Sequence, residues 1–272
     1  MEIQKVVITG GNRGLGYNLA RYLCKQTYHK LLIILTARNK QKGRNVVIQL
    51  KQEFPYCNII YQYLDVSDKT TIRNFVDWLE IKIGKVDFLI NNAGIHEGFG
   101  VKADHLQAYE IFNTNLFGLI GLTEQMLQCL SSKGKIICVS SRLGLTIQHD
   151  TQIESILSNP KLNQKKIIEL AEEYINKLKE NQLQYWNQSP FAASKSLVNA
   201  YIRHDVSKKL EEQQMAFSVC PGWCQTETGG SKAPFSCEQG IESIIYLMFE
   251  VEYQSHILFN GKFVADKKII NY

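Results

Sequence analysis

A lysine follows an aromatic residue by four positions in the stretch Phe191-Ala-Ala-Ser-Lys195. Residues i and i+4 share one face of a helix, so the ring and the ammonium group would be neighbours there. A phenol at the ring position would suit acid–base chemistry, because a nearby ammonium lowers its pKa from about 10 toward neutrality. Phe191 keeps the ring but has no hydroxyl. The pair therefore raises the question of whether this chain can transfer a proton at this position.

A glycine-rich stretch, TGGNRGLG at residues 9–16, is the second candidate for chemistry. It lies between a β-branched strand pattern and a helical pattern, which is the context of dinucleotide-binding loops. Glycines here would let the backbone turn sharply, approach a pyrophosphate and pack the helix on the sheet. The amino end of the helix would also offer N–H groups to the phosphates. The loop residues expected to touch the cofactor are Gly10, Asn12, Arg13, Gly14, Leu15 and Gly16.

The residues after the second strand pattern distinguish NADP from NAD. An NAD site usually has an acidic side chain there, which binds the ribose hydroxyls. Thr36 lies 20 residues beyond Gly16 and is not acidic, while Arg38 follows soon after it. Together with Arg13, Arg38 would suit a 2′-phosphate, since each guanidinium can donate paired hydrogen bonds. The alternative is two solvated surface arginines, and the pattern favours NADP. Asp65 and Val66 are expected to edge the adenine.

The elements that would position these residues alternate between strand and helix patterns. Strand patterns occupy residues 3–9, 31–36, 58–66, 85–90, 134–141, 215–222 and 261–266. Helical patterns follow the glycine loop and occupy residues 45–54, 68–84, 105–130, 151–158, 165–180, about 190 onward and 238–250. This alternation predicts an α/β doubly wound parallel sheet (Rossmann fold), with ligands at the carboxyl ends of the strands. We expect a single domain over residues 1–272, with a helical insertion at about 142–188.

The composition fits one large hydrophobic core: the chain has 272 residues, of which 44% are hydrophobic and 21% charged. The net charge of +5 is spread along the chain, so no nucleic-acid partner is expected. Seven scattered cysteines and six histidines show no metal-ligand spacing, so no metal is expected, and a reducing compartment fits. No apolar run is long enough to span a bilayer, and no leader pattern is seen. These features predict a cytoplasmic protein.

Several motifs in the correct order resemble the short-chain dehydrogenases/reductases, and within them the monomeric NADPH-dependent carbonyl reductases. The motifs are TGGNRGLG, TARNKQKG, LDVSD, NNAG, NTNLFG, CVSSRLG, FAASK and CPGWCQTE. The resemblance covers nearly the whole chain, and these carbonyl reductases also have a helical insertion before the FAASK helix. Because that insertion covers the surface that relatives use for oligomerising, the resemblance implies a monomer. The Lys- and Glu-rich helix of the insertion would also suit docking on another protein in a larger assembly.

The resemblance implies roles for residues at matching positions. Asn115 would hold a water in a proton relay, and Ser141 would hydrogen-bond the substrate carbonyl oxygen. Lys195 would bind the nicotinamide ribose and lower the pKa of a tyrosine four residues earlier. The residues implied to line the cofactor are Asn92, Ala93, Gly94, Pro221, Gly222 and Thr226. The family pattern is Tyr-x-x-x-Lys, and Phe191 departs from it.

The absent hydroxyl leaves three interpretations open. The first is an NADP(H)-binding pseudoenzyme or very slow reductase, kept as a binding protein or as a structural subunit of an assembly. The second is a working reductase of small carbonyls or quinones that uses Ser141, Asn115, Lys195 and a water, or a shifted tyrosine such as Tyr185. The third is an active enzyme with an engineered Tyr-to-Phe change. Losing a positioned general acid costs on the order of 10²–10⁴-fold in rate, so the sequence favours a weak or inactive reductase.

Overall fold

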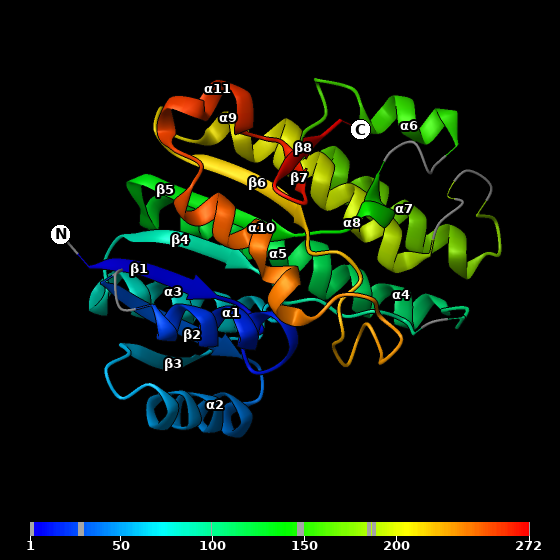
Figure 1. The fold of residues 1–272 in the computed structure, drawn as a ribbon. Helices are drawn as coiled ribbons and strands as arrows, with labels where there is room; N and C mark the ends of the chain where they lie inside the picture. The colour runs from blue at the N-terminus through cyan, green and yellow to red at the C-terminus, as the bar shows by residue number, and fades with distance from the viewer. Residues whose placement is uncertain are drawn as a thin grey trace.

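A computed structural model describes residues 3–26, 30–98, 100–145, 150–183, 186 and 189–271. One sheet of eight strands crosses the molecule in the order β3-β2-β1-β4-β5-β6-β7-β8 (Figure 1). The strands are β1 (Gln4–Ile8), β2 (Leu31–Ala37), β3 (Ile59–Tyr63), β4 (Val86–Asn91), β5 (Leu130–Val139), β6 (Met215–Cys220), β7 (Phe263–Ala265) and β8 (Lys268–Ile270). Neighbouring strands from β3 to β7 pair in parallel, and β8 pairs antiparallel to β7. The predicted doubly wound α/β fold is confirmed.

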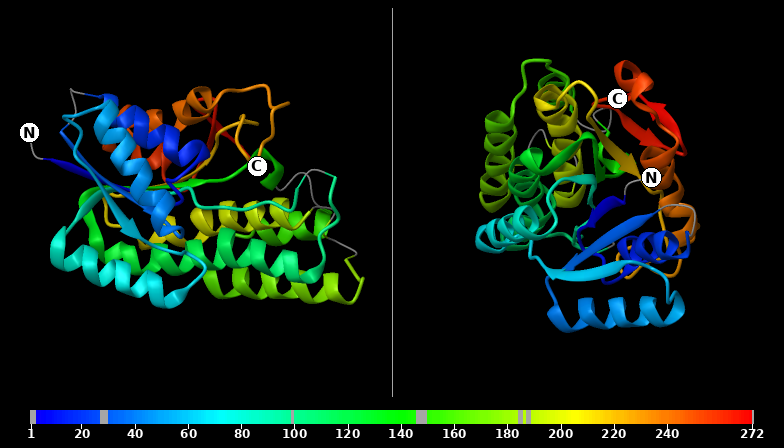
Figure 2. Two further views of the ribbon diagram at one scale, coloured as in Figure 1. Left: turned by 90° about the horizontal axis from the view of Figure 1, so that it is seen from below. Right: turned by 90° about the vertical axis from the view of Figure 1, so that its left-hand side faces the viewer.

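Helices cover both faces of this sheet (Figure 2). On one face lie α1 (Gly14–Lys25), α2 (Lys40–Glu53) and α10 (Cys237–Phe249). On the other lie α3 (Lys69–Lys82), α4 (His105–Phe112), α5 (Gly118–Met126), α7 (Gln164–Lys179) and α8 (Pro190–Tyr201). The shorter elements are α6 (Thr151–Leu157), α9 (Ser207–Lys209), α11 (His256–Phe259), the π-helices η1 (Asn113–Phe117) and η5 (Ile202–Val206), and the 3-10 helices η2 (Leu127–Cys129), η3 (Arg142–Gly144) and η6 (Tyr253–Ser255).

The strands are apolar on both faces because each face is covered by helices. In β1, Val6 and Ile8 pack on the α1 side, while Val7 between them packs on the α8 side. Successive strand residues point to opposite faces, so a strand buried on both faces needs an unbroken apolar run. This explains why the strand patterns were readable from the sequence.

The predicted helix over residues 105–130 is interrupted in the structure. It ends as an α-helix at Phe112, widens into the π-turn η1 at Asn113–Phe117 and resumes as α5. Crowding occurs at Gly118, where an added Cβ would lie 2.1 Å from the carbonyl oxygen of Val66. Single π-turns inside α-helices often occur at functional sites, and this one contains Asn115.

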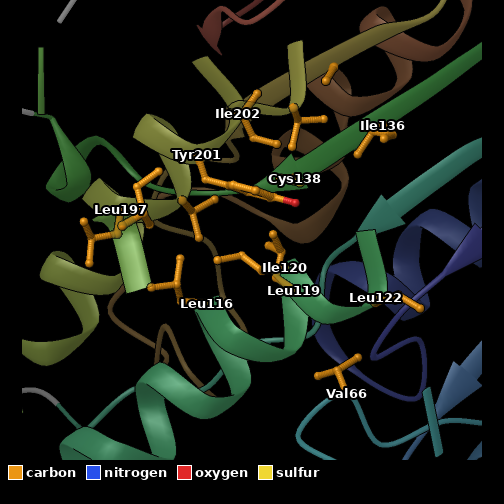
Figure 3. Packing of buried hydrophobic residues seen from close by; sticks show 14 of the residues in the cluster. Val66, Leu116, Leu119, Ile120, Leu122, Ile136, Cys138, Leu197, Tyr201 and Ile202 are labelled. Carbon is orange, nitrogen blue, oxygen red and sulfur yellow. The ribbon is translucent and has the colours of Figure 1, made fainter. Parts of the chain in front are cut away.

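The stretch predicted as an insertion contains η3, α6 and α7 among its described residues. The buried residues of α7 join the same hydrophobic cluster as α4 and α8, and Tyr174 packs with its ring centroid 5.2 Å from that of Phe112. Figure 3 shows Leu116, Leu197 and Tyr201 pointing into one packed cluster between η1, α8 and β5. This packing holds η1 and α8, which carry Asn115 and Lys195, against each other. That the stretch is an insertion in a single domain stays a prediction.

Candidate active site

A cleft of about 710 Å³ opens at the carboxyl ends of the parallel strands. Its walls come from the loops after β1, β2, β3, β4, β5 and β6 and from the start of α8. The residues predicted from the sequence that line it are Gly10, Asn12, Arg13, Gly14, Leu15, Arg38, Asp65, Val66, Asn92, Ala93, Gly94, Ser141, Phe191, Lys195, Pro221, Gly222 and Thr226. Gly16 and Asn115 are not among the lining residues. The chain folding therefore brings nearly the whole predicted set to one place.

The glycine loop, residues 9–16, forms one end of this cleft, which we call the nucleotide end. Gly16 lies behind the wall, where an added Cβ would be 2.5 Å from Asn92 Nδ2 and 2.8 Å from the Gly10 carbonyl oxygen. The same Asn92 amide donates to the Thr9 carbonyl at 2.8 Å, so it ties the loop to the end of β4. This close approach needs a residue without a side chain at position 16.

The first turn of α1 faces this end with its N–H groups. Arg13 is the N-cap residue, and its side chain makes no capping hydrogen bond. Helix N-termini with uncapped N–H groups bind anions through those groups and through the helix dipole. The turn is therefore suited to a phosphate.

Cationic side chains surround the same end. Arg13 forms an ion pair with Glu227, which lies in the loop after β6. Arg38 is exposed at the end of β2, and Lys42 lines the cleft one turn into α2. Lys42 was not predicted from the sequence, because the helix there was expected over residues 45–54, whereas α2 begins at Lys40. Asp65 is held by Ser67, whose hydroxyl donates to Asp65 Oδ1 at 2.6 Å.

The opposite end of the cleft, which we call the reaction end, contains Phe191 and Lys195 on α8. The Lys195 Nζ lies 5.6 Å from the centroid of the Phe191 ring and donates to the Val139 carbonyl at 2.7 Å. Lys195 is only 5% exposed, and burial lowers the pKa of its ammonium from 10.5 to about 8. The predicted ring–ammonium neighbourhood is therefore present, without a hydroxyl on the ring.

Asn115 lies behind this end and clamps the chain after β4. Its Oδ1 accepts from the Ile95 N–H at 2.8 Å, and its Nδ2 donates to the Ile95 carbonyl at 3.0 Å. The same Nδ2 donates to Ser194 Oγ at 3.1 Å, and Ser194 donates in turn to the Phe191 carbonyl at 2.7 Å. Asn115 thus connects η1, the loop after β4 and α8. The water relay implied by the resemblance stays a prediction.

Ser141 lies at the cleft wall directly after β5. It is the N-cap residue of η3, and its Oγ accepts from the Leu143 N–H at 3.1 Å. The carbonyl of Gly144, at the end of η3, accepts from Asn199 of α8 at 2.9 Å. Ser141 is therefore held at a fixed position relative to the helix that carries Lys195.

His96 is a reaction-end residue that the sequence reading missed. It lines the cleft, and its ring centroid lies 4.7 Å from that of Phe191. The signal available in the sequence was its position two residues after NNAG, in the loop that follows β4. Tyr185, considered above as a substitute for the absent tyrosine, lies outside the described residues.

The loop after β6 covers the cleft between its two ends. Its turn is held by Thr226, whose Oγ1 accepts from the Gly229 N–H at 2.8 Å, and by Trp223, whose indole donates to the Gly229 carbonyl at 2.7 Å. The ion pair between Arg13 and Glu227 attaches the loop to the glycine loop. Trp223 and Leu143 are both about half exposed, so the wall near the reaction end is partly apolar.

Two further surveys cover the part of the chain that the structure describes. No group of three or more His, Cys, Asp or Glu side chains is placed to hold a metal ion in residues 3–26, 30–98, 100–145, 150–183, 186 and 189–271. Within the same described ranges, no helix combines the length and apolar character needed to cross a membrane.

Comparison with known proteins identifies the class. The family model for short chain dehydrogenases matches residues 4–151, more than half of the chain, so the chain belongs to that family. Among curated proteins, carbonyl reductase [NADPH] 1 of Sus scrofa is 28% identical over 277 residues, covering 98% of this chain and 93% of that protein. Carbonyl reductase [NADPH] 1 of Homo sapiens is 28% identical over 281 residues and covers 98% of both chains.

Solved structures of the same fold cover almost the whole chain. Salutaridine reductase from Papaver somniferum superposes with a TM-score of 0.85 at 24% identity, covering 97% of this chain and 99% of that chain. An NADPH-bound carbonyl reductase from chicken fatty liver gives a TM-score of 0.72 at 19% identity and full coverage of both chains. At these identities the structures establish the shared fold.

Proposed function

We propose that this chain binds NADP(H) and is a reductase of the carbonyl reductase type whose turnover is low. The observation that carries the proposal is the pairing of a complete nucleotide end with Phe191 beside the buried Lys195. Its similarity over 98% of its length to carbonyl reductase [NADPH] 1 supports the choice of cofactor and reaction. A small carbonyl compound or quinone is the proposed substrate.

The residues at the nucleotide end fit a dinucleotide phosphate. The cleft volume of about 710 Å³ lies within the range of ligand pockets. The first turn of α1 would bind the pyrophosphate, and Arg38, with Arg13 and Lys42, would bind a 2′-phosphate. Asp65 and Val66 would contact the adenine. Asn92, Ala93 and Gly94 would support the nicotinamide ring, which faces the substrate.

At the reaction end, the residues would orient the substrate and stabilise charge. When bound, the reduced dinucleotide supplies a hydride to the carbonyl carbon. Ser141 would donate a hydrogen bond to the carbonyl oxygen, and Lys195 would stabilise negative charge there because its ammonium is desolvated. Phe191 offers no proton to the forming alkoxide, so the reduction would be slow.

A second candidate is a reductase of normal turnover in which a water bound by Lys195 and Asn115 replaces the phenol. The pKa of about 8 for Lys195 supports this candidate, because such an ammonium can give up a proton near neutral pH. An engineered replacement of a native tyrosine would give the same residue at position 191. A cytoplasmic location, and a monomer or a component of a larger assembly, stay predictions.

Melting experiments with added nucleotide test the cofactor proposal. A ligand at about 100 times its Kd stabilises a fold by about 2.7 kcal/mol. For a protein of this size, that corresponds to a rise of roughly 5–10 °C in Tm. NADPH should give this rise and NADH a smaller one. If neither nucleotide changes the Tm, the proposed function is wrong. NADPH oxidation with a panel of aldehydes and quinones then measures the turnover.

A further inference from the structure

A reduction at this cleft needs a group that can interact with the forming alkoxide, since Phe191 has none. Of the described residues that line the cleft, the titratable ones are Arg13, Arg38, Lys42, Asp65, His96, Arg142, Lys195, Cys220, Cys224 and Glu227. Arg13, Arg38, Lys42 and Asp65 lie at the nucleotide end, and Glu227 is paired with Arg13. Burial raises the pKa of the Cys220 thiol and raises that of Cys224 to about 11. His96 and Lys195 are the two cleft groups of this set that lie against Phe191.

Of the two groups, His96 lies in ring contact with Phe191. Its imidazole packs on the Phe191 ring with centroids 4.7 Å apart and an interplanar angle of 58°. The Lys195 Nζ lies 5.6 Å from the same centroid, and it already donates to the Val139 carbonyl. A substrate bound beside Phe191 in this cleft would therefore lie near the imidazole.

The backbone on both sides of His96 fixes its position. The preceding residue, Ile95, is bound through its N–H and its carbonyl to the side chain of Asn115. After it, the Gly98 N–H donates to His96 Nδ1 at 2.7 Å. Gly98 has φ of +103°, a conformation that side chains disfavour, so this short turn depends on glycine. The residues of the loop thus build a holder for the imidazole.

The hydrogen bond from Gly98 also determines which ring nitrogen carries the proton. Because Nδ1 accepts this bond, the neutral imidazole has its proton on Nε2. A neutral imidazole N–H can polarise a carbonyl and hydrogen-bond the oxygen as it becomes negative. His96 is therefore prepared to donate from Nε2, in the tautomer that such a role requires.

We propose that His96 is the hydrogen-bond and proton donor to the substrate oxygen in place of the absent phenol. This inference rests on the proposed function. The carbonyl carbon gains a C–H bond and an electron pair as the reduced dinucleotide is oxidised. The carbonyl π electrons move to the oxygen, which takes the proton from His96 Nε2 and leaves an imidazolate. Solvent water then protonates the imidazolate at Nε2, and the hydroxide enters the buffer.

Variants of His96 test this role in combination with position 191. His96→Leu should lower NADPH-driven reduction of an aromatic aldehyde at least tenfold and leave the NADPH Kd within twofold. In the Phe191→Tyr background, the same His96→Leu change should lower the rate less than threefold, because the phenol then supplies the proton. A merely structural role of His96 would cost the same factor in both backgrounds. His105→Leu is the matched control, since His105 is not among the cleft-lining residues, and its rate should be unchanged.

A binding readout independent of turnover uses protein with isotope-labelled histidines. The imidazole signals of His96, identified by their absence in His96→Leu, should shift when NADP⁺ saturates the protein, and those of His105 should not. His96 signals that do not respond, an unchanged rate in His96→Leu, or an equal loss for His96→Leu in the Phe191→Tyr background would each overturn the inference and leave the proposed function standing. An unaltered protein that binds NADPH but turns over no carbonyl would overturn the proposed reductase activity as well and leave only NADP(H) binding. Failure to bind NADPH would instead remove the proposed function.

Discussion

The two ends of the cleft are built from different parts of the chain. At the nucleotide end, the N–H groups of α1 and the glycine loop face the ligand site, with the cationic side chains of Arg13, Arg38 and Lys42 around them. At the reaction end, side chains from separate elements meet, namely His96 after β4, Ser141 after β5, and Phe191 and Lys195 on α8. The first end depends on shape, whereas the second depends on individual functional groups.

This difference means that binding and turnover can be lost separately. A backbone-lined site keeps its ligand contacts as long as its glycines and turns are kept. A site made of side chains can lose its acid through the removal of a single oxygen atom, with no change in packing. Phe191 supplies a ring that packs against His96, so the packing of the reaction end does not depend on a hydroxyl at position 191.

The largest expected effect comes from restoring the oxygen. Phe191→Tyr should raise the turnover of a quinone or aromatic aldehyde at least tenfold, because a positioned acid contributes about 10²–10⁴-fold. The buried Lys195 ammonium lies near enough to lower the pKa of the new phenol. The NADPH Kd should stay within twofold, since the nucleotide end is untouched. Steady-state rates and fluorescence titration measure the two quantities.

Phe191→Leu is the matched control, because it changes the ring without adding a hydroxyl. It should show no gain in turnover. If Phe191→Tyr also showed none, the absent hydroxyl would not limit turnover, and the contrast between the two ends would lose its basis.

The nucleotide end was readable from the sequence because its determinants are contiguous. TGGNRGLG contains the turn, the close approach at Gly16 and the helix start in eight residues. The strands were readable for a similar reason, since burial on both faces leaves long apolar runs. Lys42 was missed because α2 begins at Lys40, ahead of the helix predicted over residues 45–54.

The reaction end was only partly readable. Lys195 and Ser141 follow from ordered motifs, but the approach of His96 to Phe191 is a contact between residues 95 positions apart. The π-turn around Asn115 escaped prediction because its apolar spacing is that of an uninterrupted helix. Strand β8 was missed because its turn places Asp266 and Lys267 at φ of 51° and 60°, without the usual glycine.

A smaller effect should distinguish the phosphates at the nucleotide end. Arg38 is exposed at the cleft and forms no ion pair with the other residues that the structure describes. A hydrogen bond to a charged group contributes about 1.5–3 kcal/mol, so Arg38→Ala should weaken NADPH binding roughly 10–100-fold. NADH binding should change less than threefold. Equal losses for both nucleotides would place Arg38 away from the 2′-phosphate.

Removing the ion-pair partner of Arg13 should have the opposite effect on NADPH binding, a gain in affinity. Glu227 neutralises Arg13 in the structure, so Glu227→Gln should free the guanidinium for the 2′-phosphate. Exposed ion pairs contribute about 0–1 kcal/mol, which limits the gain in NADPH affinity to about fivefold. Weaker NADPH binding in Glu227→Gln would show instead that the pair holds the loop in its binding position.

The smallest expected effect is the pH-dependent loss of fold stability that comes from burying Lys195 at the reaction end. Lys195 is buried, and the pKa of its ammonium falls from 10.5 to about 8, so the folded state loses this proton before the unfolded state does. Between pH 8 and 10.5 the unfolded state binds more protons, and this lysine makes stability rise with pH. Below pH 8 both states are charged, and the buried charge carries its full cost.

Lys195→Met removes this contribution, so its Tm relative to the unaltered protein should fall as pH rises from 7 to 9. The change should be about 1 kcal/mol per pH unit above pH 8, or roughly 2–4 °C. Lys133→Met is the control, because Lys133 is exposed, and its Tm difference should not vary with pH. A pH-independent difference for Lys195→Met would mean that Lys195 is as well solvated as Lys133. In that case the Lys195 charge would not lower the free energy of unfolding.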